Sequence, residues 1–439
     1  MSKMDLYEYS NLQKLPADFQ LYDFKTFLNN VWQKYKDEKP KFWRESENDD
    51  NSDIDICRTQ QFLFFEEDKI KSKNYVGYIK YGNTEFNLYP KFCRGKNKDY
   101  ISKMLILWLS YSNNTIFPKI ENSSLNDIKC DSFFECLIYL FAKYTSELLS
   151  VSIYQHYEEI SEETNFLKGR LNFSDYIKNI VNGKAHKFYC TYDSFEINNK
   201  FNQIVKYVSK CLFEISKNDD SKNLLSDIIF NLDAVDDVIC TYNDCNSVYI
   251  NRFMEDFNIV LDYCKLFLQN SITFNESGDF NNFAFLLRTE TLFEDFISNA
   301  TKEILEGFKV VKTQVSFPLD NDKKYYIRPD ILIYTKENSN NLTKIADVKY
   351  KEIKSRQDIS YSDIYQCMAY AKKLKCNDVT LIYPKSLNYD FQNNTESIEI
   401  EDINIKLRFI DCCSQEDFIK IKDLFDFEKD GITSFQCTN

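Results

Sequence analysis

Two acidic residues stand in segments whose other side chains are mostly typical of buried strands. Asp330 lies in residues 327–334, and Asp347 lies in residues 344–350. A carboxylate in such a segment is costly unless a partner compensates its charge. The two acids therefore indicate a site with chemistry rather than ordinary strand packing.

The residues between these segments, 336–341, are rich in Asn and Ser, as expected of a turn. With the turn centred between Asn338 and Ser339, the two acids lie equally far along the chain from its centre. Asp330 and Asp347 are then cross-strand neighbours in an antiparallel hairpin, with Cβ atoms roughly 5 Å apart. This prediction depends on the register, because a slip of one residue sends a side chain to the other face.

Like charges that face each other across a hairpin are destabilising, and a divalent cation between them removes that cost. Oxygen ligands of this kind suit Mg²⁺ or Mn²⁺. Lys349 lies two residues beyond Asp347 and points to the same face, where its charge can orient a metal-bound water. Val348 points the other way, but its backbone carbonyl is available to a metal shell.

Two helical segments offer further polar groups. Gln366 and Tyr370 are four residues apart on one helical face and flank an apolar stripe. Upstream, Glu290 and Glu294 have the same spacing on another helix. A single motif of this kind is common by chance, and the prediction rests on the whole set.

The elements around these residues follow the order helix, strand, strand, strand, helix, strand. We expect them over residues 285–305, 308–317, 325–334, 343–350, 361–374 and 379–383. This αβββαβ succession predicts a mixed sheet covered by helices, in a domain spanning 276–439. Residues 1–95 contain short β-like runs, and residues 96–275 are mainly helical, with helical apolar spacing in 100–111 and 133–150. The fold class predicted is thus α+β, with three domains.

The composition argues against several classes of functional site and of protein. The 439 residues include eight Gly, two His, and fourteen Cys without a C-x-x-C pair, which argues against zinc sites and histidine triads. Gly77 and Gly82 have phosphate-loop spacing, but Asn83 replaces the essential lysine, and a strand end or hairpin is the better interpretation. There is no signal core and no apolar run long enough to cross a membrane, so we expect a cytoplasmic protein with reduced thiols.

The net charge of the whole chain and the local charge of its C-terminal part lead to different expectations about nucleic-acid binding. The formal net charge of −13 argues against a passive nucleic-acid coat. Residues 340–390, however, contain nine Lys or Arg against six Asp or Glu. This distribution favours a protein with a weak grip of its own on DNA, delivered there by another subunit.

The motifs together resemble the PD-(D/E)XK nuclease superfamily and, within it, the McrC family of nuclease subunits from McrBC-type restriction systems. The likeness runs from about residue 75 to about residue 425. It rests on Tyr78-Ile-Lys-Tyr-Gly82, Leu88-Tyr-Pro90-Lys91, Leu167-Lys-Gly169-Arg170-Leu171, residues 192–202, Leu292-Phe-Glu294, Arg328-Pro-Asp330-Ile, Ala346-Asp-Val-Lys349-Tyr350, Asp363 to Tyr370, and Leu381-Ile-Tyr-Pro384.

The resemblance implies roles for the residues. Asp330 and Asp347 ligate Mg²⁺ together with the Val348 carbonyl, and Glu294 completes the metal shell. Lys349 positions the attacking water. Gln366 and Tyr370 order the site or contact the phosphate backbone.

The resemblance also implies partners and an activity. Such subunits dock through the part that precedes the nuclease domain, here residues 96–275, into a hexameric McrB-like AAA+ GTPase. They stimulate its GTP hydrolysis, so GTP is used by the partner, and the assembly cuts double-stranded DNA in antiviral defence. Two alternatives stay open: a non-catalytic assembly factor that activates the GTPase, and a stand-alone RecB-like DNA repair nuclease.

Overall fold

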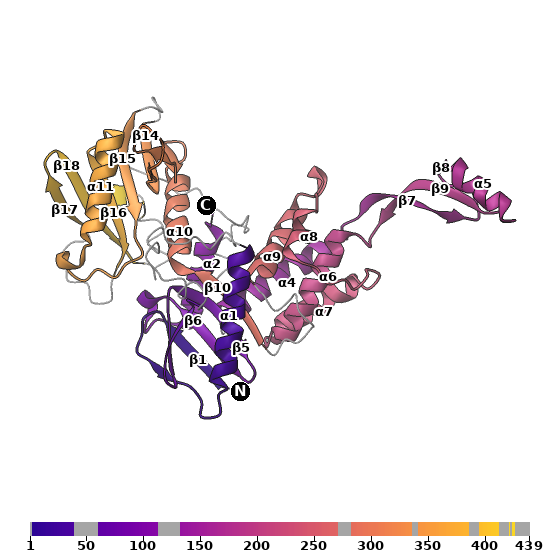
Figure 1. Cartoon of the computed structure of the whole chain (residues 1–439), viewed down its shortest axis with the longest axis horizontal. Helices are drawn as coiled ribbons and strands as arrows, with labels where there is room; N and C mark the ends of the chain where they lie inside the picture. Colours follow the sequence, from indigo (N-terminus) through magenta and orange to yellow (C-terminus); the bar gives the residue numbers. More distant parts are fainter. Residues whose placement is uncertain are drawn as a thin grey trace. The chain divides into compact units, whose positions relative to one another are not determined.

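The computed structural model (Figure 1) describes residues 2–38, 60–112, 132–270, 282–335, 341–385, 395–411, 421 and 424–425. The predicted turn centre between Asn338 and Ser339 lies outside these residues. The chain divides into two compact units. Unit 1 comprises Met1–Cys136, Asn270–Ile272 and Asn281–Asn439, and unit 2 comprises Leu137–Gln269 and Thr273–Phe280.

A four-stranded sheet in unit 1 joins N-terminal strands to a strand that lies some 200 residues further along the chain. Its order is β1 (Ser2–Tyr7), β6 (Thr84–Tyr89), β5 (Tyr75–Tyr81) and β10 (Asn282–Arg288). The expected helix start at residue 285 is wrong, because residues 285–288 belong to β10. The apolar run there is buried within the sheet, and periodicity alone does not separate a short buried strand from a helix.

Gly77 makes the pairing of β5 with β10 possible. A Cβ atom at this position would lie 2.1 Å from the backbone oxygen of Phe285 on β10. Gly82 occupies the β5–β6 hairpin turn, which confirms the hairpin interpretation of this glycine pair. One face of this sheet packs on α1 (Leu21–Glu38), and the small sheet of β2 (Gln13–Lys14), β4 (Lys69–Ser72) and β3 (Leu63–Glu66) adds to the same core.

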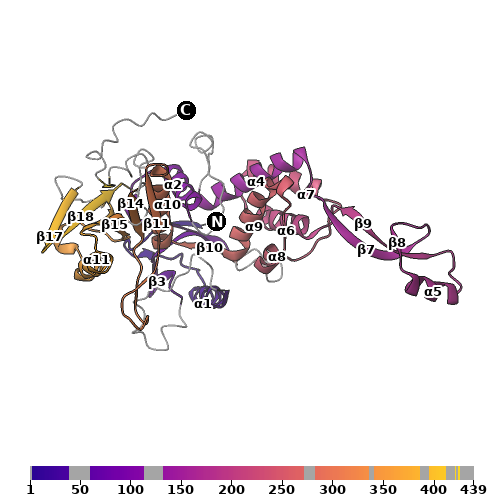
Figure 2. The same ribbon diagram turned by 90° about the horizontal axis from the view of Figure 1, so that it is seen from above.

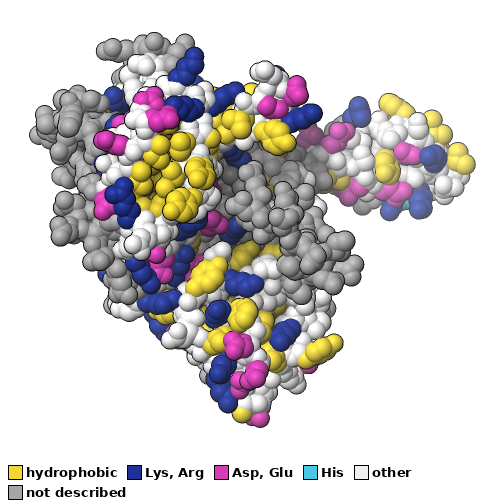
Figure 3. Space-filling view, turned by 60° about the vertical axis from the view of Figure 1, so that its left-hand side comes forward, with side chains coloured by type: hydrophobic (Ala, Val, Ile, Leu, Met, Phe, Trp, Pro, Cys, Tyr) yellow, Lys and Arg dark blue, Asp and Glu magenta, His cyan; other side chains and the backbone are white. Residues whose placement is uncertain are grey.

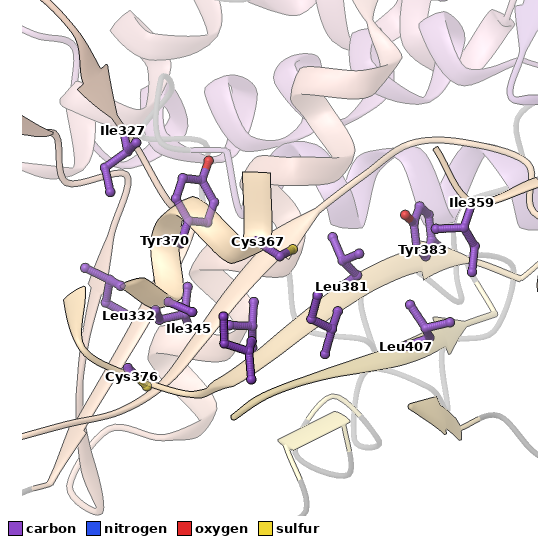
Figure 4. Packing of buried hydrophobic residues seen from close by; sticks show 14 of the residues in the cluster. Ile327, Leu332, Ile345, Ile359, Cys367, Tyr370, Cys376, Leu381, Tyr383 and Leu407 are labelled. Atoms are coloured by element: carbon purple, nitrogen blue, oxygen red, sulfur yellow. The ribbon is translucent and has the colours of Figure 1, made fainter. Parts of the chain in front are cut away.

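A six-stranded mixed sheet forms the other part of unit 1. Its order is β11 (Lys309–Thr313), β14 (Ile331–Thr335), β15 (Leu342–Val348), β16 (Asp378–Pro384), β18 (Ile403–Ile410) and β17 (Thr395–Ile400). The helices α10 (Thr289–Ile304) and α11 (Tyr361–Leu374) lie on different sides of it (Figure 2). Figure 4 shows the core between α11 and the strands, where Cys367 and Tyr370 pack with Leu332, Ile345 and Leu381.

The predicted order of elements is confirmed in this sheet, but two predicted strands are divided. The segment 308–317 ends as β11 at Thr313, because Gln314 adopts a left-handed backbone with φ of 52°. The segment 325–334 splits into β13 (Tyr326–Ile327) and β14, since Pro329 between them has no N–H to donate. The short strand β12 (Phe317–Pro318) pairs with β13.

Unit 2 combines helices with a ribbon of two long strands (Figure 1). The helices are the greater part of α4 (Phe133–Val151), α6 (Lys200–Ile215), α7 (Asp219–Asn231), α8 (Tyr242–Asn246) and α9 (Asp256–Asn270). The ribbon consists of β7 (His156–Thr164), β9 (Phe188–Glu196), the short β8 (Arg170–Leu171) and α5 (Phe173–Val181). The helices predicted at 100–111 and 133–150 are confirmed as α2 (Lys98–Ser110) and α4.

Candidate active site

The β14–β15 hairpin has the register that the sequence predicts next to the two acids. Ile331 pairs with Ala346, and Leu332 pairs with Ile345, which places Asp330 and Asp347 opposite each other at the end of the ladder. A bulge between Ile333 and Tyr334 shifts the pairing by one residue on the turn side only. The bulge leaves the pairing of the acid end unchanged, because it lies between that end and the turn.

The two carboxylates lie against each other, with Asp347 buried and Asp330 half-buried. Asp347 is only 1% exposed, and Oδ2 of Asp330 accepts a hydrogen bond of 2.8 Å from the backbone N–H of Val348. Burial first, and then the charge of Asp347, raises the pKa of Asp330 to about 8. Burial also raises the pKa of Asp347, although the Lys349 ammonium opposes this effect.

Lys349 supplies the positive charge of the site. Its Nζ lies 2.7 Å from Oδ2 of Asp347, which confirms that the two side chains share a face. Burial lowers the pKa of Lys349, but the charges of Asp347 and Asp330 outweigh burial and raise it overall. The lysine is therefore a permanent cation beside two acids.

Glu294 on α10 is electrostatically part of the same group. Its pKa is raised well above the ordinary value by burial and then by the charges of Asp330 and Glu290, while Lys349 opposes the increase. Glu290, its partner in the predicted pair, instead forms an ion pair of 3.0 Å with Arg288.

Gln366 and Tyr370 lie together on α11, as predicted. Nε2 of Gln366 donates to the Tyr370 hydroxyl at 2.6 Å, and this hydroxyl donates at 3.4 Å to the backbone carbonyl of Arg328. Burial, followed by the charges of Asp347 and Asp330, raises the pKa of Tyr370. The pair thus ties α11 to the backbone that leads into Asp330.

A second ion pair beside the site has no role assigned from the sequence. Nζ of Lys351 contacts both carboxylate oxygens of Asp363, at 2.7 and 2.9 Å, and the Tyr383 hydroxyl donates to Asp363 at 3.1 Å. The negative charge of Asp363 contributes to the raised pKa of Asp347. The strand β15 ends at Val348, and the Lys351 N–H donates to the Lys349 carbonyl, so strand alternation does not place Lys351 and the sequence held no simple signal for this pair.

The acids fit a divalent cation, although not as a complete cage. Oδ2 of Asp347 is buried and receives no hydrogen bond of standard geometry, so its charge is compensated mainly by the Lys349 ion pair. Among the described residues, no three His, Cys, Asp or Glu side chains are grouped closely enough to hold a metal ion by themselves. Mg²⁺ typically uses one or two carboxylates, with water and substrate phosphate as its other ligands. The Asp330–Asp347 pair satisfies that requirement.

Comparison with known protein families shows to which family the chain belongs. The sequence profile described as "McrBC 5-methylcytosine restriction system component" matches residues 70–384. The chain belongs to the McrBC family. The match includes every site residue discussed above, whereas β1, α1, β17 and β18 of this McrBC-family chain lie outside it.

Two solved structures have a similar fold. A chain of the refined half-complex from the tetradecameric assembly of Thermococcus gammatolerans McrB AAA+ hexamers with bound McrC superposes with a TM-score of 0.74. It is 18% identical, with 96% of this chain and 99% of that chain covered. A chain of the cryo-EM structure of the Thermococcus gammatolerans McrBC complex gives a TM-score of 0.55 at 20% identity, covering 70% and 89%. No curated protein sequence matches the chain.

The surface of this McrBC-family chain has mixed charge. In Figure 3, Lys and Arg side chains lie among Asp and Glu, and no continuous basic face is visible from that side. None of the described helices is long and apolar enough to cross a bilayer.

Proposed function

We propose that the chain is the Mg²⁺-dependent DNA endonuclease subunit of an McrBC-type restriction system, with a PD-(D/E)XK nuclease core. One observation carries this proposal: two facing carboxylates and a lysine lie together, largely withdrawn from solvent, at the end of a hairpin. Burial of three charges is costly for folding. A cluster of perturbed acids beside a cation is what phosphodiester hydrolysis assisted by a metal requires.

The chain's own residues divide the work. Asp330 and Asp347 would hold the metal, with the Val348 carbonyl and Glu294 as further ligands. A bound Mg²⁺, or Mn²⁺, supplies Lewis-acid chemistry and a nucleophilic water at neutral pH. Lys349 orients the attacking water and stabilises the negative charge that develops on the phosphate. Gln366 and Tyr370 hold the segment before Asp330 in place.

A partner is part of the proposal. One similar structure is an assembly of McrB AAA+ hexamers with bound McrC. The tip of the ribbon in unit 2 suits docking, because it exposes large apolar side chains that have no place on a solvated surface. They are Phe166, Leu167, Phe173, Ile177, Ile180 and Val181. We assign GTP hydrolysis to the AAA+ partner, since this sequence lacks a phosphate-loop lysine.

Reconstitution with the AAA+ partner, GTP, Mg²⁺ and double-stranded DNA tests the proposal. Asp347→Ala and Lys349→Ala should abolish cleavage while assembly and GTPase stimulation persist. Lys354→Ala is the matched control, because Lys354 is a nearby exposed lysine whose ion-pair partner is Glu352. Normal cleavage by both site variants would refute the site assignment.

The same experiment separates the two alternatives. GTPase stimulation by the wild-type chain without cleavage in any divalent metal would support a non-catalytic assembly factor. Cleavage by the isolated chain, with no partner and no GTP, would support a stand-alone repair nuclease.

A further inference from the structure

A buried carboxylate in the N-terminal sheet contacts the segments that carry the candidate site. Glu8 directly follows β1 and is fully buried. Its Oε2 accepts hydrogen bonds from the Tyr350 hydroxyl at 2.7 Å and from the Lys91 backbone N–H at 3.2 Å, and its Oε1 accepts one from the Thr289 hydroxyl. Three segments that are far apart in the sequence thus meet at one side chain.

Each of these donors has a defined relation to the site. Tyr350 directly follows Lys349. Thr289 is the first residue of α10, the helix that carries Glu294. A carboxylate that holds both donors fixes the end of the Asp347–Lys349 segment relative to the start of α10.

Lys91 strengthens the same connection. Its Nζ donates to the backbone carbonyl of Tyr350 at 3.2 Å and lies 4.6 Å from the centre of the Tyr350 ring. The Tyr350 ring also packs on Phe92 and on Phe293, the neighbour of Glu294, with ring centres 5.3 and 5.5 Å apart. The Tyr350 side chain is therefore held both by the residues that follow β1 and β6 and by α10.

We propose that Glu8 is a positioning residue of the nuclease site, which orients Lys349 and Glu294 by holding Tyr350 and Thr289. This inference rests on the nuclease function proposed above. Glu8 lies outside residues 70–384, so the family match says nothing about it. The N-terminal sheet becomes part of the active-site framework, and a displacement of β1 is transmitted to the Asp347–Lys349 segment.

The test compares Glu8→Ala, Tyr350→Phe and the double variant, each assembled with the AAA+ partner. Loss of an outer-shell partner commonly lowers activity by about 10- to 100-fold. We expect each single variant to lower the single-turnover cleavage rate by about that factor, with GTPase stimulation unchanged. The double variant should be no slower than Glu8→Ala, because both changes break the same connection.

Asp5→Asn is the matched control. Asp5 lies on β1, and its carboxylate accepts from Asn87 and pairs with Lys98, both in the N-terminal part of the chain. This variant should cleave at the wild-type rate. Wild-type cleavage by Glu8→Ala, or independent and multiplicative effects of the two single changes, would overturn the proposal.

Hydrogen exchange measured on the isolated chain decides the inference without relying on cleavage. Glu8→Ala should speed exchange in residues 345–351 and 289–294, and leave the ribbon of unit 2 unchanged. Unchanged exchange in both site segments would also overturn the positioning role. If the wild-type chain cuts no DNA, the nuclease proposal fails, and the exchange result still shows whether Glu8 holds these segments.

Discussion

The end of the β14–β15 hairpin and the tip of the unit 2 ribbon depart from the usual distribution of side chains in opposite directions. At the hairpin end, Asp330, Asp347 and Lys349 are largely withdrawn from solvent. At the ribbon tip, apolar side chains such as Phe173 and Val181 are 70% and 80% exposed. Both arrangements oppose folding, since buried charge and exposed apolar surface are each unfavourable. The first indicates chemistry on a charged substrate, and the second indicates a protein partner.

The largest effect should follow from neutralising the buried pair. Asp330→Asn removes a charge from the site and should lower Mg²⁺-dependent cleavage by on the order of 10³-fold, because several kcal/mol of charge stabilisation depend on the metal. At pH 9 without metal, where Asp330 with its pKa of about 8 is ionised, the same change should raise the free energy of unfolding, since it removes a buried like-charge interaction. Cleavage assays and urea unfolding in a chelator measure the two effects.

Asp378→Asn is the control, for which we expect the opposite change in stability. Asp378 begins β16 in the same sheet, and its Oδ2 lies 3.2 and 3.1 Å from the ammonium groups of Lys344 and Lys406. Its replacement should decrease stability, because each of the two lysines loses one ion-pair partner. If both Asn variants shift stability in the same direction, the Asp330–Asp347 pair is not the strained feature proposed here.

Sequence patterns predicted the geometry of the candidate site better than they predicted the elements around it. Strand alternation and symmetry about a turn are local properties, and they correctly placed Asp347, Lys349 and Asp330. The bulge near Ile333 was not predictable from the same arithmetic, and the prediction survived because the bulge lies on the turn side of the acids.

Strand pairing between distant segments, and strands without a buried face, had no comparable pattern in the sequence. The strand β10 joins β5 across some 200 residues, and its apolar run is equally compatible with a buried helix. The strand β7 is Glu-rich with no alternating apolar face, because the ribbon has no core to cover it. Glu8 and Tyr350 are 342 residues apart in the sequence, so no spacing indicates their contact.

The buried carboxylate of Glu8 should make the stability of unit 1 depend on pH. Burial, opposed in part by hydrogen bonds from Thr289 and Tyr350, raises the pKa of Glu8 to about 7 from the model-peptide value of 4.5. Between these values the unfolded chain releases a proton that the folded chain keeps, so stability falls as pH rises. The expected loss is about 3 kcal/mol from pH 4.5 to above pH 7.

Comparison of the wild-type chain with Glu8→Gln isolates this contribution. Denaturant unfolding at pH 5 and pH 8 should show the variant gaining about 3 kcal/mol relative to the wild type at the higher pH. If the free energy of unfolding changed equally with pH in the two proteins, Glu8 would be ionised throughout, and its hydrogen bonds would outweigh its burial.

Substitutions at the ribbon tip should weaken binding to the AAA+ partner without changing the free energy of unfolding. Replacing Phe173 and Ile177 with Ser removes exposed apolar anchors, and should weaken assembly with the AAA+ partner by about 10-fold or more. The free energy of unfolding should stay within about 0.5 kcal/mol, because neither side chain is buried. Phe230→Ser is the control, since Phe230 is 80% exposed on α7, away from the ribbon. Equal loss of binding in the control would remove the ribbon's special role.

The smallest effect is expected from Tyr370, which packs in the core beneath α11. Tyr370→Phe keeps the packed ring and removes only the hydroxyl, which accepts from Gln366 and has a long contact to Arg328. The expected cost is about 1 kcal/mol of stability, with cleavage slower by about threefold. Tyr370→Ala should cost about 3–5 kcal/mol, because it leaves a cavity in the core beneath α11. Phe would then restore most of what Ala loses, which identifies the ring as the important part. A Phe variant with wild-type melting temperature and no cleavage would show that the hydroxyl itself contacts the substrate, and would move Tyr370 from the framework of the site into its chemistry.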